Sequence, residues 1–145
     1  MSGADSSQPA SVGVIVACRR MDGRWLLVRR AEGLSRGPGM VGFPGGSVEP
    51  GETQAQAVVR EMQEELAADV APVRSFWSSV DHVPGFALFG WLAELRTPID
   101  QLVPSPDEVA QILWLTGEEA IAHPRSFEDI AGFIAAARAA LDFDA

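Results

Sequence analysis

Residues 45–66 read GGSVEPGETQAQAVVREMQEEL, a glycine-rich loop that leads into an acidic helix. Pro50-Gly51 is a turn signal, and Glu52 is typical of a helix N-terminus. Because no further glycine or proline occurs before Pro72, we predict a helix from about Thr53 to Ala68. The remaining segments are interpreted around this loop and helix.

The predicted helix has an apolar face and an acidic face. At about 100° per residue its apolar side chains form one stripe, while Glu61, Glu64 and Glu65 cluster roughly 120° away. Like charges at this spacing repel one another, and the helix macrodipole also disfavours acids near a C-terminus. A hard divalent cation such as Mg²⁺ or Mn²⁺ would relieve the repulsion. The helix alone therefore indicates either a metal site or a solvated acidic face.

The loop and the helix together carry a longer pattern. Five residues separate Gly46 from Glu52, seven separate Glu52 from Arg60-Glu61, and Glu64-Glu65 follow two residues later. This spacing resembles the Nudix box, G-x5-E-x7-R-E-U-x-E-E-x-G-U, in which U is aliphatic. The preceding Phe43-Pro44-Gly45-Gly46 also fits that family.

Two positions depart from the box. Ala67 stands in place of its later glycine, and Ala68 in place of its closing aliphatic residue. Glycine at the first position normally lets the helix end in a left-handed turn, so Ala67 is expected either to extend the helix or to strain its exit.

The resemblance implies a hydrolase that cleaves a nucleoside diphosphate linked to another group, by means of water activated by Mg²⁺, with Mn²⁺ as a substitute. It assigns the metal to the Gly46 carbonyl and the carboxylates of Glu61, Glu64 and Glu65. Either Glu61 or Glu64 would accept the proton of the water. Arg60 would hold the acids in position through charge-assisted hydrogen bonds, and Glu52 would pair with Arg60.

Further candidates lie outside the box. Arg29, Arg30 and Arg36 belong to an N-terminal cluster of basic residues and are candidates to bind substrate phosphates, with solubilisation of a surface strand as the alternative. Phe43 is a substrate-binding candidate beside the glycines. Glu108, at the end of a proline-containing loop, is a candidate accessory metal ligand or base, or a plain exposed acid. Several aromatic residues could stack on a nucleobase or face a core: Phe76, Trp77, Phe86, Phe89 and Trp91.

The other segments predict strands and helices in alternation. Strands are predicted at residues 11–18, 24–30, 73–80, 86–95 and 111–115, the first two as a pair. Residues 31–42 form a loop of the kind that closes over ligands. A short helix begins at Thr116, and another spans Ser126 to Leu141 with Ser126 as its N-cap. This order favours a layered α/β fold, and the resemblance specifies an α/β/α sandwich around a mixed β-sheet.

Composition limits the partners. The 145 residues fit one domain, with a leader at residues 1–10 and the Nudix domain at residues 11–145. A net charge of −9 argues against binding nucleic acid or an anionic membrane, and leaves a small nucleotide as the partner. With one cysteine and no run of about 18 apolar residues, a cytoplasmic protein is expected. Both a monomer and a homodimer are compatible with the sequence.

Two alternatives to an active nucleotide hydrolase remain. A Nudix-like module that binds a nucleotide without cleaving it would be indicated by loss of box acids, and none is lost. Residues 26–31 and 39–46 also resemble the extra motif of Nudix coenzyme A pyrophosphatases. That motif has an arginine where Ser35 stands, and Arg36 is one place off, so coenzyme A is kept only as an alternative substrate.

Overall fold

The protein was analysed as a computed structural model, which describes residues 11–83 and 85–144. The predicted leader at residues 1–10 lies outside the described residues. The described elements are, in chain order, β1 (Ser11–Ala17), β2 (Trp25–Arg30), β3 (Val41–Gly42), β4 (Gly45–Ser47), α1 (Gln54–Leu66), β5 (Val70–Val83), β6 (Phe86–Leu95), the 3-10 turn η2 (Ile99–Gln101), β7 (Val109–Leu115), α2 (Gly117–Ala122) and α3 (Ile130–Asp144).

The strands form two sheets. The larger has the order β4-β1-β6-β5 and is mixed, because β1 runs parallel to β6 while the other pairs are antiparallel. The smaller is antiparallel with the order β3-β2-β7. The predicted pairing of the first two strands is wrong, apart from a single bridge between Arg19 and Trp25. Both edges of β1 are already occupied, by β4 and β6, so β2 pairs elsewhere.

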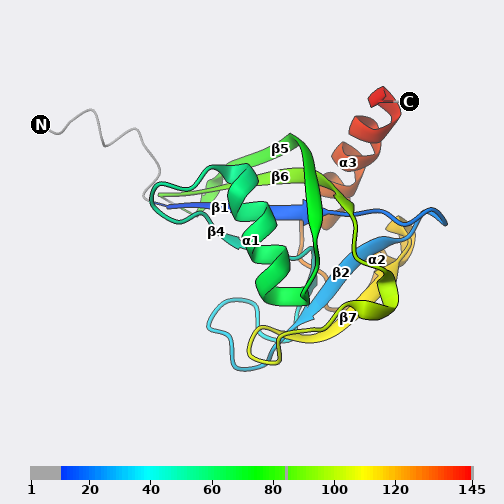
Figure 1. Cartoon of the computed structure of the whole chain (residues 1–145), viewed down its shortest axis with the longest axis horizontal. Coiled ribbons are helices and arrows are strands. Elements are labelled where there is room, and N and C mark those ends of the chain that lie inside the picture. Colours follow the sequence, from blue (N-terminus) through cyan, green and yellow to red (C-terminus); the bar gives the residue numbers. More distant parts are fainter. Residues whose placement is uncertain (1–10, 84, 145) are drawn as a thin grey trace, which may run out of the picture.

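The helices cover opposite sides of the strands, as Figure 1 shows with α1 in front of the larger sheet and α3 behind it. Along β2 the side chains alternate between two cores. Leu26 and Val28 belong to the core that contains the apolar face of α1, and Trp25 and Leu27 to the core that contains α3. The predicted α/β class and layered arrangement are confirmed, with the strands divided between two sheets.

The ends of α1 are defined by local chemistry. Thr53 caps the N-terminus, since its side chain accepts a hydrogen bond from the Gln56 amide while the Gln56 side chain accepts one from the Thr53 amide. The C-terminal cap is Ala67, with φ 52° and ψ 35°. It is the only non-glycine residue with positive φ in the described part of the chain. The sequence allowed either a longer helix or a strained exit at Ala67. The structure has the strained exit, because alanine disfavours the left-handed conformation that ends the helix.

The last helix differs from the prediction at its start. It begins at Ile130 rather than Ser126, and it runs to Asp144. The Ser126 hydroxyl donates to the Ala120 carbonyl over 2.5 Å, so it ties the segment to α2 instead of capping α3. None of the helices described is both long enough and apolar enough to cross a membrane.

Candidate active site

A cleft of about 640 Å³ opens where β4 and α1 meet β1, β2 and β6. Its wall contains two groups of side chains. The charged side chains come from β2, the β2–β3 loop, α1, the loops before α1 and β7, and the segment before α3. This charged group consists of Arg30, Arg36, Glu49, Arg60, Glu61, Glu64, Glu65, Glu108 and Asp129. The aromatic group consists of Phe43, Trp77, Phe86, Phe127 and Phe133.

The three acids of α1 differ in exposure. Glu61 is 8% exposed and Glu65 is 5% exposed, whereas 51% of the Glu64 side chain is exposed. Gly46 lies directly against Glu61, and a Cβ atom at that position would overlap the Glu61 carboxylate. Glycine at residue 46 therefore lets the loop backbone approach the buried acid closely.

Burial favours the neutral form of the two least exposed acids of α1, Glu61 and Glu65. Desolvation raises the pKa of both Glu61 and Glu65, and the negative charges of Glu61 and Glu108 raise that of Glu65 further. The Oε2 atom of Glu65 is buried and has no hydrogen-bond partner, the only such side-chain atom among the described residues. A cation at this site would supply the missing partner.

Arg60 connects the loop to the helix acids. Its guanidinium donates to both carboxylate oxygens of Glu52, over 2.7 and 2.9 Å, and to the Ser47 carbonyl over 2.7 Å. Its Nη1 atom donates to Glu61 over 2.9 Å and to Glu64 over 3.3 Å. The bonds from Arg60 lower the pKa of Glu52 to about 2. The bonds to Glu52 and Glu61 raise the pKa of Arg60. One side chain thus orients acids on two elements.

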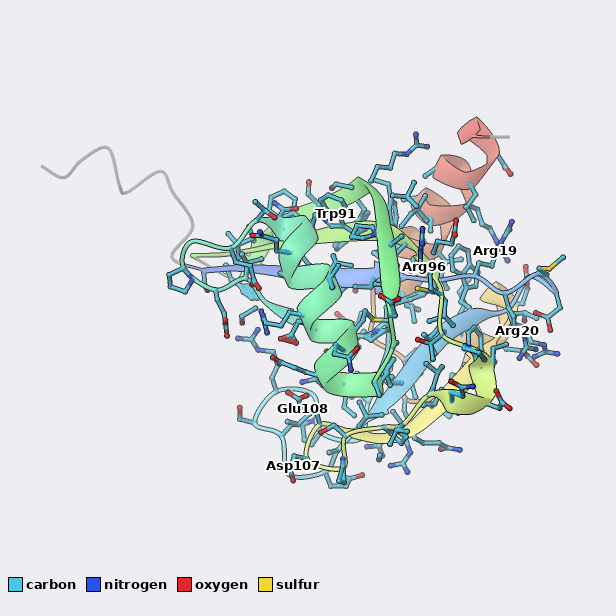
Figure 2. The ribbon with its side chains drawn as sticks, in the orientation of Figure 1. Arg19, Arg20, Trp91, Arg96, Asp107 and Glu108 are labelled. Atoms are coloured by element: carbon cyan, nitrogen blue, oxygen red, sulfur yellow. The ribbon has the colours of Figure 1, made fainter. Side chains whose placement is uncertain are left out.

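Glu108 reaches the cleft from the loop before β7. The Ala31 amide donates to the Glu108 carbonyl over 3.0 Å, and the Ser105 amide donates to the Glu65 carbonyl over 2.8 Å. The loop is therefore fixed both to the residue that follows β2 and to α1. Figure 2 shows Glu108 beside the C-terminal end of α1 and Asp107 farther from it. The sequence candidate therefore lines the same cleft as the box acids.

The structure separates the arginine candidates. Arg30 and Arg36 line the cleft together with Phe43, whereas Arg29 is not part of its wall. Arg29 instead lies 3.4 Å from the Gln111 side chain and 3.9 Å from Glu32. Of these two neighbours at the end of β2, only Arg30 therefore reaches the cleft.

The sequence prediction missed part of the aromatic wall. Trp77 and Phe86 were among the stacking candidates, but Phe127 and Phe133, which lie in the last predicted helix, were not. Phe133 does pack, with ring centroids 4.7 Å from Phe43 and 5.2 Å from Trp77, and it also lines the cleft. A helical apolar pattern does not distinguish a core side chain from one at the edge of a core.

The site residues fit a divalent cation by chemistry. Carboxylate and carbonyl oxygens are the ligands that Mg²⁺ and Mn²⁺ prefer, and the unpartnered Glu65 oxygen lies among them. Within the described ranges, no group of three or more His, Cys, Asp or Glu side chains already has metal-ligand geometry. The acids Glu61 and Glu64 are instead bonded to Arg60.

Comparisons with known proteins agree with this arrangement. The family model described as NUDIX domain matches residues 9–137. The CTP pyrophosphohydrolase of Escherichia coli (strain K12) is 32% identical over 121 residues, which cover 82% of this chain and 86% of that protein. The NAD-capped RNA hydrolase NudC of Stutzerimonas stutzeri (strain A1501) is 34% identical over 77 residues, which cover 53% of this chain and only 27% of that protein.

Solved structures show the same fold. The MutT protein of Methanosarcina mazei Go1 superimposes with a TM-score of 0.74 at 21% identity, over 88% of this chain and 92% of that one. The E. coli ORF135 protein gives a TM-score of 0.70 at 27% identity, over 92% and 91% of the two chains. With the box residues gathered on one cleft and the family model covering most of the sequence, the chain belongs to the MutT-like Nudix hydrolase family and is a pyrophosphohydrolase.

Proposed function

We propose that this protein hydrolyses the diphosphate linkage of a small nucleotide, a nucleoside triphosphate or a nucleotide sugar, with Mg²⁺ as its cofactor. The observation that carries the proposal is the convergence of Glu61, Glu64, Glu65 and Glu108 on one cleft that also has an aromatic wall. The acids suit a cation and its phosphate ligand, and the rings suit a base.

The cation would be held by the Gly46 carbonyl and the carboxylates of Glu61, Glu64 and Glu65, with Glu108 as an accessory ligand. When bound, it would reduce the negative charge of the diphosphate and make a water molecule more acidic. Glu65 contributes the buried oxygen that has no other partner. Gly46 contributes a backbone that approaches Glu61 without a side chain in between.

The protein's own groups position the reaction and accept the proton. Glu64 has half of its side chain exposed in the cleft, so water reaches it readily, while Glu61 is buried beside Gly46. These two acids are the candidates for the base. Arg60, fixed by both oxygens of Glu52, restricts Glu61 and Glu64 to one geometry and so lowers the cost of orienting them.

The rest of the cleft would bind the nucleotide. Arg30 is half-buried, and desolvation lowers its pKa, so a phosphate group would gain from pairing with it. The rings of Trp77 and Phe133, in edge contact with each other, offer an apolar wall for a base. The similarity to a CTP pyrophosphohydrolase supports a nucleoside triphosphate, and the net charge of −9 argues against a polymeric substrate such as capped RNA.

A panel of substrates tests the proposal. The purified protein is incubated with nucleoside triphosphates, nucleotide sugars, NAD, coenzyme A and an NAD-capped RNA, each with Mg²⁺ or with EDTA, and the products are identified by mass. We expect one class of small nucleotide to release a nucleoside monophosphate in the presence of Mg²⁺ but not in EDTA. Cleavage of capped RNA or coenzyme A in preference to every nucleotide would contradict the proposed substrate class.

A further inference from the structure

The loop at residues 31–40, which connects β2 to β3, runs along the mouth of the cleft. Leu34, Ser35 and Arg36 form part of the cleft wall. The Arg30 side chain donates from Nε to the Arg36 carbonyl over 3.0 Å, which holds the middle of the loop against the end of β2. In Figure 1 this loop lies at the end of the molecule where α1 finishes, beside the loop before β7.

The base of the loop is held firmly. Arg125 donates from Nε to the Gly39 carbonyl over 3.1 Å, and the Met40 amide donates to the Gly37 carbonyl over 3.1 Å. Gly37 has φ +58°, and a Cβ atom there would press on the Phe127 ring, so only glycine fits both the backbone and the space. The base is therefore a fixed support for the loop's tip.

The tip makes a different kind of contact. The guanidinium carbon of Arg36 lies 4.8 Å from the centroid of the Phe86 ring. Phe86 is the first residue of β6. Phe86 belongs to the aromatic wall, whereas Arg30 belongs to the charged group. The tip of the loop thus contacts the aromatic wall at Phe86 through an exposed cation–π contact, which is among the weaker contacts in proteins.

We propose that residues 31–40 form a strap over the cleft, and that Arg36 stacked on Phe86 is the latch that keeps the strap closed when no nucleotide is bound. A latch of this strength is suited to opening and closing, because phosphate groups bind a guanidinium more strongly than an aromatic ring does. Only the identity of the entering nucleotide rests on the proposed function; the latch itself is a property of the free protein.

Hydrogen–deuterium exchange on the substrate-free protein tests the latch. We compare the peptide covering residues 31–42 in wild type, Arg36→Ala, Phe86→Leu and the double variant. Arg19→Ala is the matched control, because Arg19 also stacks on a ring, that of Trp25 at 5.8 Å, but lies outside the cleft wall. Exchange in the α1 peptide reports whether each variant keeps its fold.

We expect each single variant to speed exchange of the strap peptide about threefold, as expected for loss of one exposed cation–π contact, while Arg19→Ala does not. The double variant should exchange no faster than the faster single variant, because both changes break the same contact. Unchanged exchange in either single variant, or effects that multiply in the double variant, would overturn the latch. Since no substrate is present, this result is independent of whether the proposed hydrolysis is found.

Discussion

Glu65 has the least favourable surroundings of any carboxylate in the site. One of its oxygens is buried without a partner, and Glu61 and Glu108 place further negative charge near it. A buried polar atom without a hydrogen bond costs about 1–3 kcal/mol, a cost that a bound cation would remove. Burial raises the Glu65 pKa, so the neutral acid is favoured in the metal-free protein.

Replacing Glu65 by glutamine therefore has two separable effects. In EDTA, Glu65→Gln should change the melting temperature little, because a neutral amide replaces an acid that is favoured in its neutral form. With Mg²⁺, wild type should be stabilised and Glu65→Gln should not. Differential scanning fluorimetry measures both, with the exposed Glu94→Gln as the control. Equal stabilisation of Glu65→Gln and wild type would exclude Glu65 as a ligand.

Cys18 gives a prediction about pH. It is 1% exposed, and burial raises the pKa of its thiol to about 12, whereas an unfolded cysteine titrates near about 8.5. The unfolded chain therefore loses this proton first, so the contribution of Cys18 to stability is full below about pH 8.5 and is lost as pH rises towards 12. The native thiol is also a poor nucleophile.

Alkylation with iodoacetamide at pH 8 measures this directly. Native protein should react at least about a hundredfold more slowly than protein unfolded in urea, because the thiolate is suppressed and the thiol is buried. The Cys18→Ser variant, which has no thiol, gives the background rate of the assay. Equal rates for native and unfolded protein would contradict the burial of Cys18.

Helix α1 shows how far a local pattern determines an element. Its start follows from the Thr53 capping box, and its apolar face from residues spaced by one turn, so both were predictable. Its end was not decided by sequence, because Ala67 allowed a longer helix or a strained exit. The structure has Ala67 left-handed, with its amide bonded to the Gln63 carbonyl over 3.0 Å.

Ala67→Gly should therefore stabilise the protein. Removing the Cβ atom relieves a left-handed conformation that costs roughly 1–2 kcal/mol, less the extra entropy of glycine in the unfolded chain, for a net gain of about 0.5–1 kcal/mol. Urea unfolding measures the change. Ala55→Gly, in the first turn of the same helix, should instead lose stability, because glycine has a lower helix propensity than alanine. A loss of stability in Ala67→Gly comparable to that of Ala55→Gly would contradict the strained exit.

Pairing and boundaries that depend on contacts with other elements were harder to predict. The first two strands were predicted to pair, but β4 and β6 occupy both edges of β1. Ser126 resembled a helix cap, but its hydroxyl bonds α2. In both cases the deciding partner lies outside the predicted element, so the propensity of that element carries no information about it.

At the scale of the whole molecule, the cleft is assembled from segments that the sequence keeps apart. The box supplies Gly46 and the acids of α1 within a short stretch, which is why a single spacing pattern could predict them. Glu108, Phe127 and Phe133 come from the loop before β7 and from the α3 region, and only the folded chain brings them to the same cavity. The catalytic candidates were thus more predictable than the substrate-binding wall.

The central claim is that the carboxylates of α1 act with Mg²⁺ to hydrolyse a nucleotide diphosphate. The most direct test is the turnover rate of wild type and Glu64→Gln on CTP, or on the best substrate of the panel, with saturating Mg²⁺. We predict that wild type releases nucleoside monophosphate and that Glu64→Gln is at least about a hundredfold slower, because a charged group essential to the transition state is lost. Turnover of Glu64→Gln within about threefold of wild type, with both proteins folded, would contradict the account.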